Sequence, residues 1–205
     1  MHRVETTAQR IARTLADRIV SGELAPGTPL RQDHVAEEFE SSHVPAREAF
    51  QLLRAQGLAV SEPRRGMRVA PLDSASMQEI VEIRASLEAL ALTHAAPRLN
   101  GAAFEKIEGA LRAGDEAKTM IEWELANRAF HRELAAPCKM PRLLAMLDEL
   151  QLATSRIIFS ATRSAGWQPG SSYAHRQIVD ALKRRDAQKA TALLQKHIRM
   201  LERAG

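Results

Sequence analysis

The chain has few aromatic residues, a single cysteine and no long apolar run. Each of these shortages excludes or disfavours a class of protein. Aromatic residues make up only 4% of the sequence, whereas Ala, Leu, Arg and Glu are plentiful. Unbranched side chains lose little rotamer freedom in a helix, so this composition favours a mainly α fold. Cys138 has no partner for an internal disulfide, and no N-terminal apolar signal or apolar segment of about 18 residues occurs. We therefore expect a cytoplasmic protein that does not enter a membrane.

The N-terminal third of the chain also has almost no net charge. Residues 1–71 carry ten arginines and nine acidic residues, whereas residues 140–205 carry eleven basic and five acidic residues, within a net charge of +4. Any contact of the N-terminal third with DNA must therefore come from a few placed arginines rather than from a general basic field.

The pattern of the N-terminal third predicts a helix-turn-helix. A first helix over residues 6–20 ends at Gly22, and the two prolines and the glycine within residues 24–30 predict a loop there. Two short helices follow, over 32–39 and over 43–56, joined by a three-residue turn in which Ser42 is the expected N-cap. In such a unit the second helix enters the major groove with its N-terminal residues toward the bases.

Two short strands are predicted directly after these helices. They span residues 58–62 and 67–70 and flank a turn of Pro63, Arg64, Arg65 and Gly66. A hairpin with arginines at its tip is placed to reach phosphates or the minor groove. The N-terminal third therefore predicts a winged helix-turn-helix.

After a linker near Pro71, the remaining sequence predicts an antiparallel all-α helical bundle. The expected helices span residues 74–96, 101–118, 119–136, 140–165, 171–184 and 186–203. The predicted domains are accordingly a DNA-binding domain over 1–71 and a helical domain over 72–205.

Three histidines lie on the apolar faces of three predicted bundle helices. Asn127 and His131 share one face four residues apart, His175 opens an apolar stripe, and His197 lies on another. Three inward imidazoles would each need a buried partner, and a shared metal ion would satisfy all of them together. Neutral imidazole suits zinc first, with nickel, manganese or iron as alternatives.

Several separated motifs of the N-terminal third resemble the DNA-binding domain of the GntR family. They are Gly22-Glu23-Leu24-Ala25-Pro26-Gly27, Pro45-Ala46-Arg47-Glu48-Ala49, Gln56-Gly57-Leu58 and Arg65-Gly66-Met67-Arg68-Val69, in the family's order. The family's usual Val-Ser-Arg-Thr reads Ser41-Ser42-His43-Val44 here, which replaces a base-contacting arginine by histidine and a threonine by valine. The resemblance implies DNA contacts through Arg47 foremost, and through His43, Val44, Arg31, Arg64, Arg65 and Gly66.

The helical domain resembles the ligand-binding FCD domain of the FadR branch of that family. Asn127, His131, His175 and His197 fit the arrangement of its metal ligands, and Glu82-Ile83-Arg84-Ala85-Ser86-Leu87-Glu88 is similar to its first helix. The resemblance implies a small carboxylic acid on the metal, contacted by Arg84. The other interpretation of Arg84 is an ion pair with Glu88, four residues on.

These features together predict a transcriptional repressor, not an enzyme, that binds a palindromic DNA operator as a homodimer. Three histidines could also activate water in a metal-dependent hydrolase, but the sequence has no His-Glu-x-x-His motif and no assignable general base. Two further alternatives are a metal sensor without an organic effector and a helical domain that only dimerises.

Overall fold

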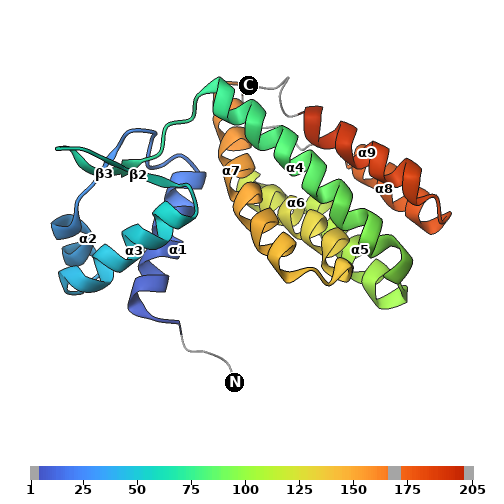
Figure 1. Ribbon diagram of the computed structural model, residues 1–205, viewed down its shortest axis with the longest axis horizontal. Helices are drawn as coiled ribbons and strands as arrows, with labels where there is room; N and C mark the ends of the chain where they lie inside the picture. Colours follow the sequence, from blue (N-terminus) through green and yellow to red (C-terminus); the bar gives the residue numbers. More distant parts are fainter. Residues whose placement is uncertain (1–4, 166–171, 201–205) are drawn as a thin grey trace. The chain divides into compact units, whose positions relative to one another are not determined.

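The computed structural model describes residues 5–165 and 172–200, and these divide into two compact units at Asp73 and Ser74. The division falls two residues beyond the predicted boundary. Each unit is described separately below (Figure 1). In the described part of the chain, every helix is too short or too polar to cross a lipid bilayer.

The first unit consists of three helices and a small antiparallel sheet. Its elements are α1 (Thr7–Val20), β1 (Pro29–Leu30), α2 (Gln32–Glu38), α3 (His43–Ala55), β2 (Ala59–Glu62) and β3 (Gly66–Val69). The strand order is β1-β3-β2, with Val60 opposite Arg68 and Leu30 opposite Met67. This is the winged helix-turn-helix that the sequence predicts.

The core of this unit lies between α1 and α3. Ile11 and Leu15 of α1 are buried with Phe50 and Leu53 of α3, at the three- and four-residue spacings that place side chains on one helix face. A capping box of Thr6 and Gln9 begins α1. These contacts bury one face of α3 against α1, and the opposite face of α3 remains exposed.

Two local details of the first unit differ from the sequence prediction. Residues 29 and 30, expected in a loop, form β1, because Leu30 pairs with Met67, which lies 37 positions further along the chain. Ser42 takes the N-cap position of α3, but its side chain makes no capping hydrogen bond. The pairing of β1 depends on a distant strand that local patterning does not reveal.

The second unit is a helical bundle. Its α-helices are α4 (Ser74–Ala95), α5 (Gly101–Glu116), α6 (Met120–Ala135), α7 (Pro141–Ala165), α8 (Tyr173–Lys183) and α9 (Ala187–Arg199). The short 3-10 turns η1 (Ala96–Arg98) and η2 (Ala136–Cys138) follow α4 and α6. The predicted spans agree to within two residues where the structure describes them. The predicted ends at 171 and 201–203 lie outside the described residues.

Helix α4 occupies the centre of the bundle. It packs against α9 on one side and against α7 and α6 on the other, while α5 packs on α6 and α8 on α9 (Figure 1). Prolines 97 and 137 and the N-caps Asn100, Thr119 and Asp186 set the helix ends. This packing brings the inner faces of α4, α6, α8 and α9 together.

Candidate functional site

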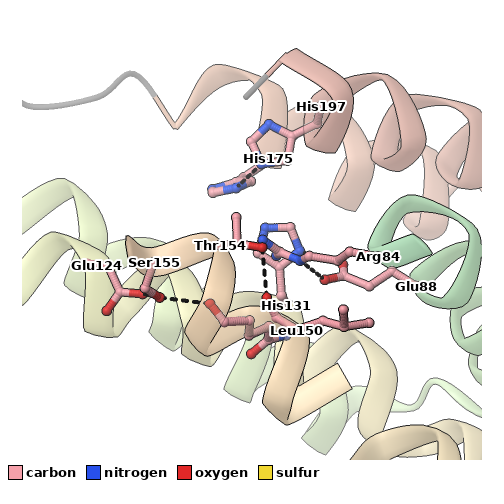
Figure 2. Close-up of polar contacts among 10 residues, drawn as sticks. Arg84, Glu88, Glu124, His131, Leu150, Thr154, Ser155, His175 and His197 are labelled. Atoms are coloured by element: carbon pink, nitrogen blue, oxygen red, sulfur yellow. Dashed lines mark hydrogen bonds and ion pairs between the residues drawn. The ribbon is translucent and has the colours of Figure 1, made fainter. Parts of the chain in front are cut away.

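Three histidines from three helices converge inside the bundle. His131 comes from α6, His175 from the first turn of α8 and His197 from the last turn of α9. One ring nitrogen of each lies within 4.8 Å of one ring nitrogen of each of the others. Figure 2 shows His175 and His197 facing His131 from the neighbouring helical layer. The sequence-predicted histidines are therefore brought to one place.

Burial keeps these imidazoles neutral. His131 and His175 are buried and His197 is half-buried. Removal from water lowers the pKa of all three, to about 3 for His197, and the charges of neighbouring groups, including Arg84, act in addition. Neutral imidazole is the form that binds a metal ion, so the site does not have to lose protons at neutral pH.

The distance between His175 and His197 can be compared with the spacing of two ligands on one metal ion. Their Nε2 atoms lie 2.9 Å apart, and His175 is held in place by stacking on Phe130, with ring centroids 4.2 Å apart. Two ligand nitrogens on a tetrahedral zinc ion, each at about 2.0–2.1 Å, are separated by roughly 3.3 Å. The two nitrogens therefore lie within roughly 0.4 Å of the spacing of two ligands on one zinc ion.

The third histidine presents the matching nitrogen. His131 uses Nδ1 in a 2.7 Å hydrogen bond with Oε2 of Glu88. With the proton on Nδ1, the Nε2 of His131 carries the lone pair that a metal ion requires. The three residues therefore fit a divalent transition metal.

Asn127, the fourth predicted ligand, lies one helical turn before His131. It is buried, and it lines a small pocket together with His175, Phe130 and Ser172. Its amide could supply one neutral oxygen beside the histidines.

Glu88 is a site residue that sequence reasoning did not assign to the metal centre. Its Oε1 accepts a 2.7 Å hydrogen bond from Nε of Arg84, and its Oε2 bonds with His131. Burial alone would raise the pKa of Glu88, but the Arg84 charge and His131 lower it overall. The i+4 spacing from Arg84 indicates the ion pair, whereas His131 lies 43 residues away and leaves no local signal.

Replacing Glu88 by glutamine is expected to lower zinc affinity about 10- to 100-fold, the range found for residues that support metal-bound histidines. The amide removes the negative charge that fixes the His131 tautomer and makes its Nε2 more basic. Competition with a chromophoric chelator measures the affinity. Glu82→Gln on the same helix is the matched control, because Glu82 pairs with Arg199 rather than with a histidine. Equal zinc affinity of the two variants would contradict the role of Glu88.

Arg84, predicted to contact an effector, is 2% exposed. The ion pair with Glu88, the alternative interpretation, is present, but it uses Nε alone. Within the described residues, the two terminal amino groups of Arg84 donate no hydrogen bond. They remain available to another acceptor.

A second buried polar group lies between α6 and α7. The carboxyl of Glu124 contacts the Ser155 hydroxyl and lies 3.0 Å from Nε of Arg128, and burial raises its pKa. Ser155 also donates to the backbone oxygen of Gln151 at 2.9 Å. One hydroxyl proton cannot be donated to both acceptors at once, and the buried Nε of Arg128 has no hydrogen-bond partner among the residues that the structure describes.

The predicted DNA contacts lie on two exposed parts of the first unit. His43, Val44 and Arg47 occupy the first turns of α3, outside its buried face. The His43 ring lies 3.4 Å from the Asp33 carboxylate of α2, and Arg31 is exposed at the start of α2.

The wing places its arginines at the turn between β2 and β3. Arg64 and Arg65 are exposed, and Arg65 lies 3.7 Å from Glu62. Arg64 and Gly66 both have positive φ, at 64° and 76°, a conformation that is cheap for glycine and uncommon for arginine. The backbone therefore turns tightly and leaves both guanidinium groups outside.

Comparisons with known proteins agree with this geometry over both units. Residues 7–69 match the family model for bacterial regulatory proteins of the gntR family, and residues 79–200 match the model for the FCD domain. The chain is 30% identical to a probable D-xylose utilization operon transcriptional repressor of Paenarthrobacter nicotinovorans, over 94% of this chain and 86% of that protein. It is 27% identical to the HTH-type transcriptional repressor GlaR of Escherichia coli K12, over 91% and 90% of the two chains.

The fold is also that of a solved structure. Escherichia coli McbR/YncC superposes with a TM-score of 0.80 at 22% identity, covering 97% of this chain and 98% of that one. A winged helix-turn-helix followed by an FCD domain defines a DNA-binding transcriptional regulator. The chain belongs to the GntR family and carries an FCD domain as its second unit.

Proposed function

We propose that the protein is a transcriptional repressor whose affinity for its operator is controlled by a small carboxylic acid bound at a metal site in the helical unit. The observation that carries the proposal is the convergence of His131, His175 and His197 in a domain joined to a winged helix-turn-helix. The relatives named as repressors support the direction of control.

Different residues of the bundle would bind the metal ion and the carboxylic acid. His131, His175 and His197 would hold a divalent metal, zinc in preference to nickel, manganese or iron, with Asn127 as an additional oxygen ligand. The metal would supply a Lewis-acidic cation for the acid group of the effector. The terminal amino groups of Arg84 would donate to the same carboxylate, because a guanidinium suits the two oxygens of an acid.

The helix that carries Arg84 and Glu88 directly follows the DNA-binding unit in the chain. Arg84 and Glu88 lie on α4, whose first residue follows the boundary between the two units. A ligand bound to the terminal amino groups of Arg84 would share its guanidinium with Glu88, which bonds to Nε. Because Glu88 also bonds to His131, such a ligand would act on the orientation of that ring. We infer that α4 is the element whose two arrangements distinguish the DNA-binding states.

The protein would act in the cytoplasm as a homodimer that binds a palindromic operator. One helix-turn-helix reads only a few base pairs, and a twofold pair of them reads two half-sites. Sedimentation velocity of the full chain, with and without operator DNA, tests the dimer.

The experiment that tests the control compares three states of the full chain: metal-free, zinc-loaded, and zinc-loaded with each of a panel of small carboxylic acids. Fluorescence anisotropy measures binding to a duplex selected from a random library. We expect at least one acid to change the affinity of the zinc-loaded protein about 5- to 150-fold, the usual range of allosteric coupling. The metal-free protein should not respond.

Two outcomes would overturn the proposal. A change on zinc loading with no further effect of any acid would indicate a metal sensor. Equal DNA affinity in all three states would indicate a helical unit that serves only for dimerisation. A metal-dependent hydrolase is less favoured, because the relatives reported above are transcriptional regulators.

A further inference from the structure

One exposed side chain on α3 has no role in the fold. Val44 is 52% exposed, which makes it the most exposed large hydrophobic residue in the described part of the first unit. The buried face of α3 is made by Ala46, Ala49, Phe50 and Leu53, and Val44 points away from it. Valine is also a weaker helix former than most residues at an exposed position. Folding therefore gives no reason for a valine here.

Val44 lies on the same exposed face of α3 as Arg47 and Gln51, and this position suggests which group of the DNA its isopropyl group contacts. These residues are spaced i, i+3 and i+7, so they share one face of α3, and all three are exposed. His43 lies to one side of this face, toward Asp33 of α2. Val44 is therefore the apolar member of an otherwise polar surface at the N-terminal end of the helix that enters the major groove.

The chemistry of the major groove contains one matching apolar group. Base edges there present hydrogen-bond donors and acceptors, and only the C5-methyl of thymine is apolar. A valine can neither donate nor accept, so polar base edges covered by it would lose hydrogen bonds to water. We propose that Val44 determines operator sequence by packing on a thymine methyl in each half-site. This rests on the proposed role of α3 as the recognition helix.

The test removes the methyl group from DNA and the isopropyl group from the protein. Operator duplexes are first selected from an unmodified random library with the full-length wild-type chain, so that thymine is the only source of a C5-methyl. Each thymine of the consensus is then replaced in turn by deoxyuracil. Val44→Ala and the wild type are compared by anisotropy, with Leu52→Ala as the matched control, because Leu52 is 38% exposed on another side of α3.

We expect one thymine in each half-site at which deoxyuracil weakens wild-type binding about fourfold, the effect of exposing one buried methyl group. Val44→Ala should be insensitive to that exchange, and Leu52→Ala should respond as the wild type does. The proposal fails if no thymine responds, or if Val44→Ala responds as strongly as the wild type. Failure of the wild type to select any sequence would instead refute the recognition role of α3, which separates the two failures.

Discussion

His175→Ala is expected to lower zinc affinity about 100-fold or more. Structural zinc sites are worth about 10–16 kcal/mol across their ligands, so a single imidazole carries several kcal/mol. Its loss also leaves the Nε2 of His197 without the neighbour that lies 2.9 Å away. Competition with a chromophoric chelator gives the affinity, and mass spectrometry under native conditions gives the number of zinc ions per chain.

A matched control separates loss of a ligand from loss of fold. His94→Ala removes an exposed histidine from α4 of the same unit, and it should leave zinc affinity within about twofold of wild type. Circular dichroism of both variants checks that the helices persist. Should His175→Ala bind zinc as tightly as His94→Ala, the histidine cluster is not the metal site and the proposed control by a metal-bound acid loses its basis.

Arg47→Ala is expected to lower affinity for the selected operator at least tenfold. A base contact by arginine is worth about 1–3 kcal/mol, and a dimer loses two such contacts. The side chain is exposed on the outward face of α3, where the fold does not use it. Anisotropy titrations at several salt concentrations separate this loss from a uniform loss of phosphate contacts.

The same helix offers a matched arginine. Arg54 lies exposed in the last turn of α3, far from the N-terminal residues that face the bases. Arg54→Ala removes an equal charge and should change operator affinity by less than about threefold. Equal losses in the two variants would show that α3 contributes only charge, and would remove Arg47 from sequence recognition.

Much of the first unit could be predicted from sequence because its signals are local. Gly57 ends α3 at a positive φ of 68°, and the periodicity of Ile11, Leu15 and Ile19 gives the buried face of α1. The wing follows from a short turn between two strands. The pairing of β1 with β3 was missed because two residues carry no periodicity and their partners lie far along the chain.

At the site, helical spacing in the sequence identifies which histidines point inward, because nearby residues alone assign a side chain to a helix face. Helix packing is needed to show that the ring nitrogens of His131, His175 and His197 lie within 4.8 Å of one another. It is also needed to show that Glu88, 43 residues from His131, bonds to the His131 ring. The packing of α4 against α6 and α9 sets those distances. Periodicity gives the direction of a side chain on its own helix, but the separation between helices arises only when the bundle closes.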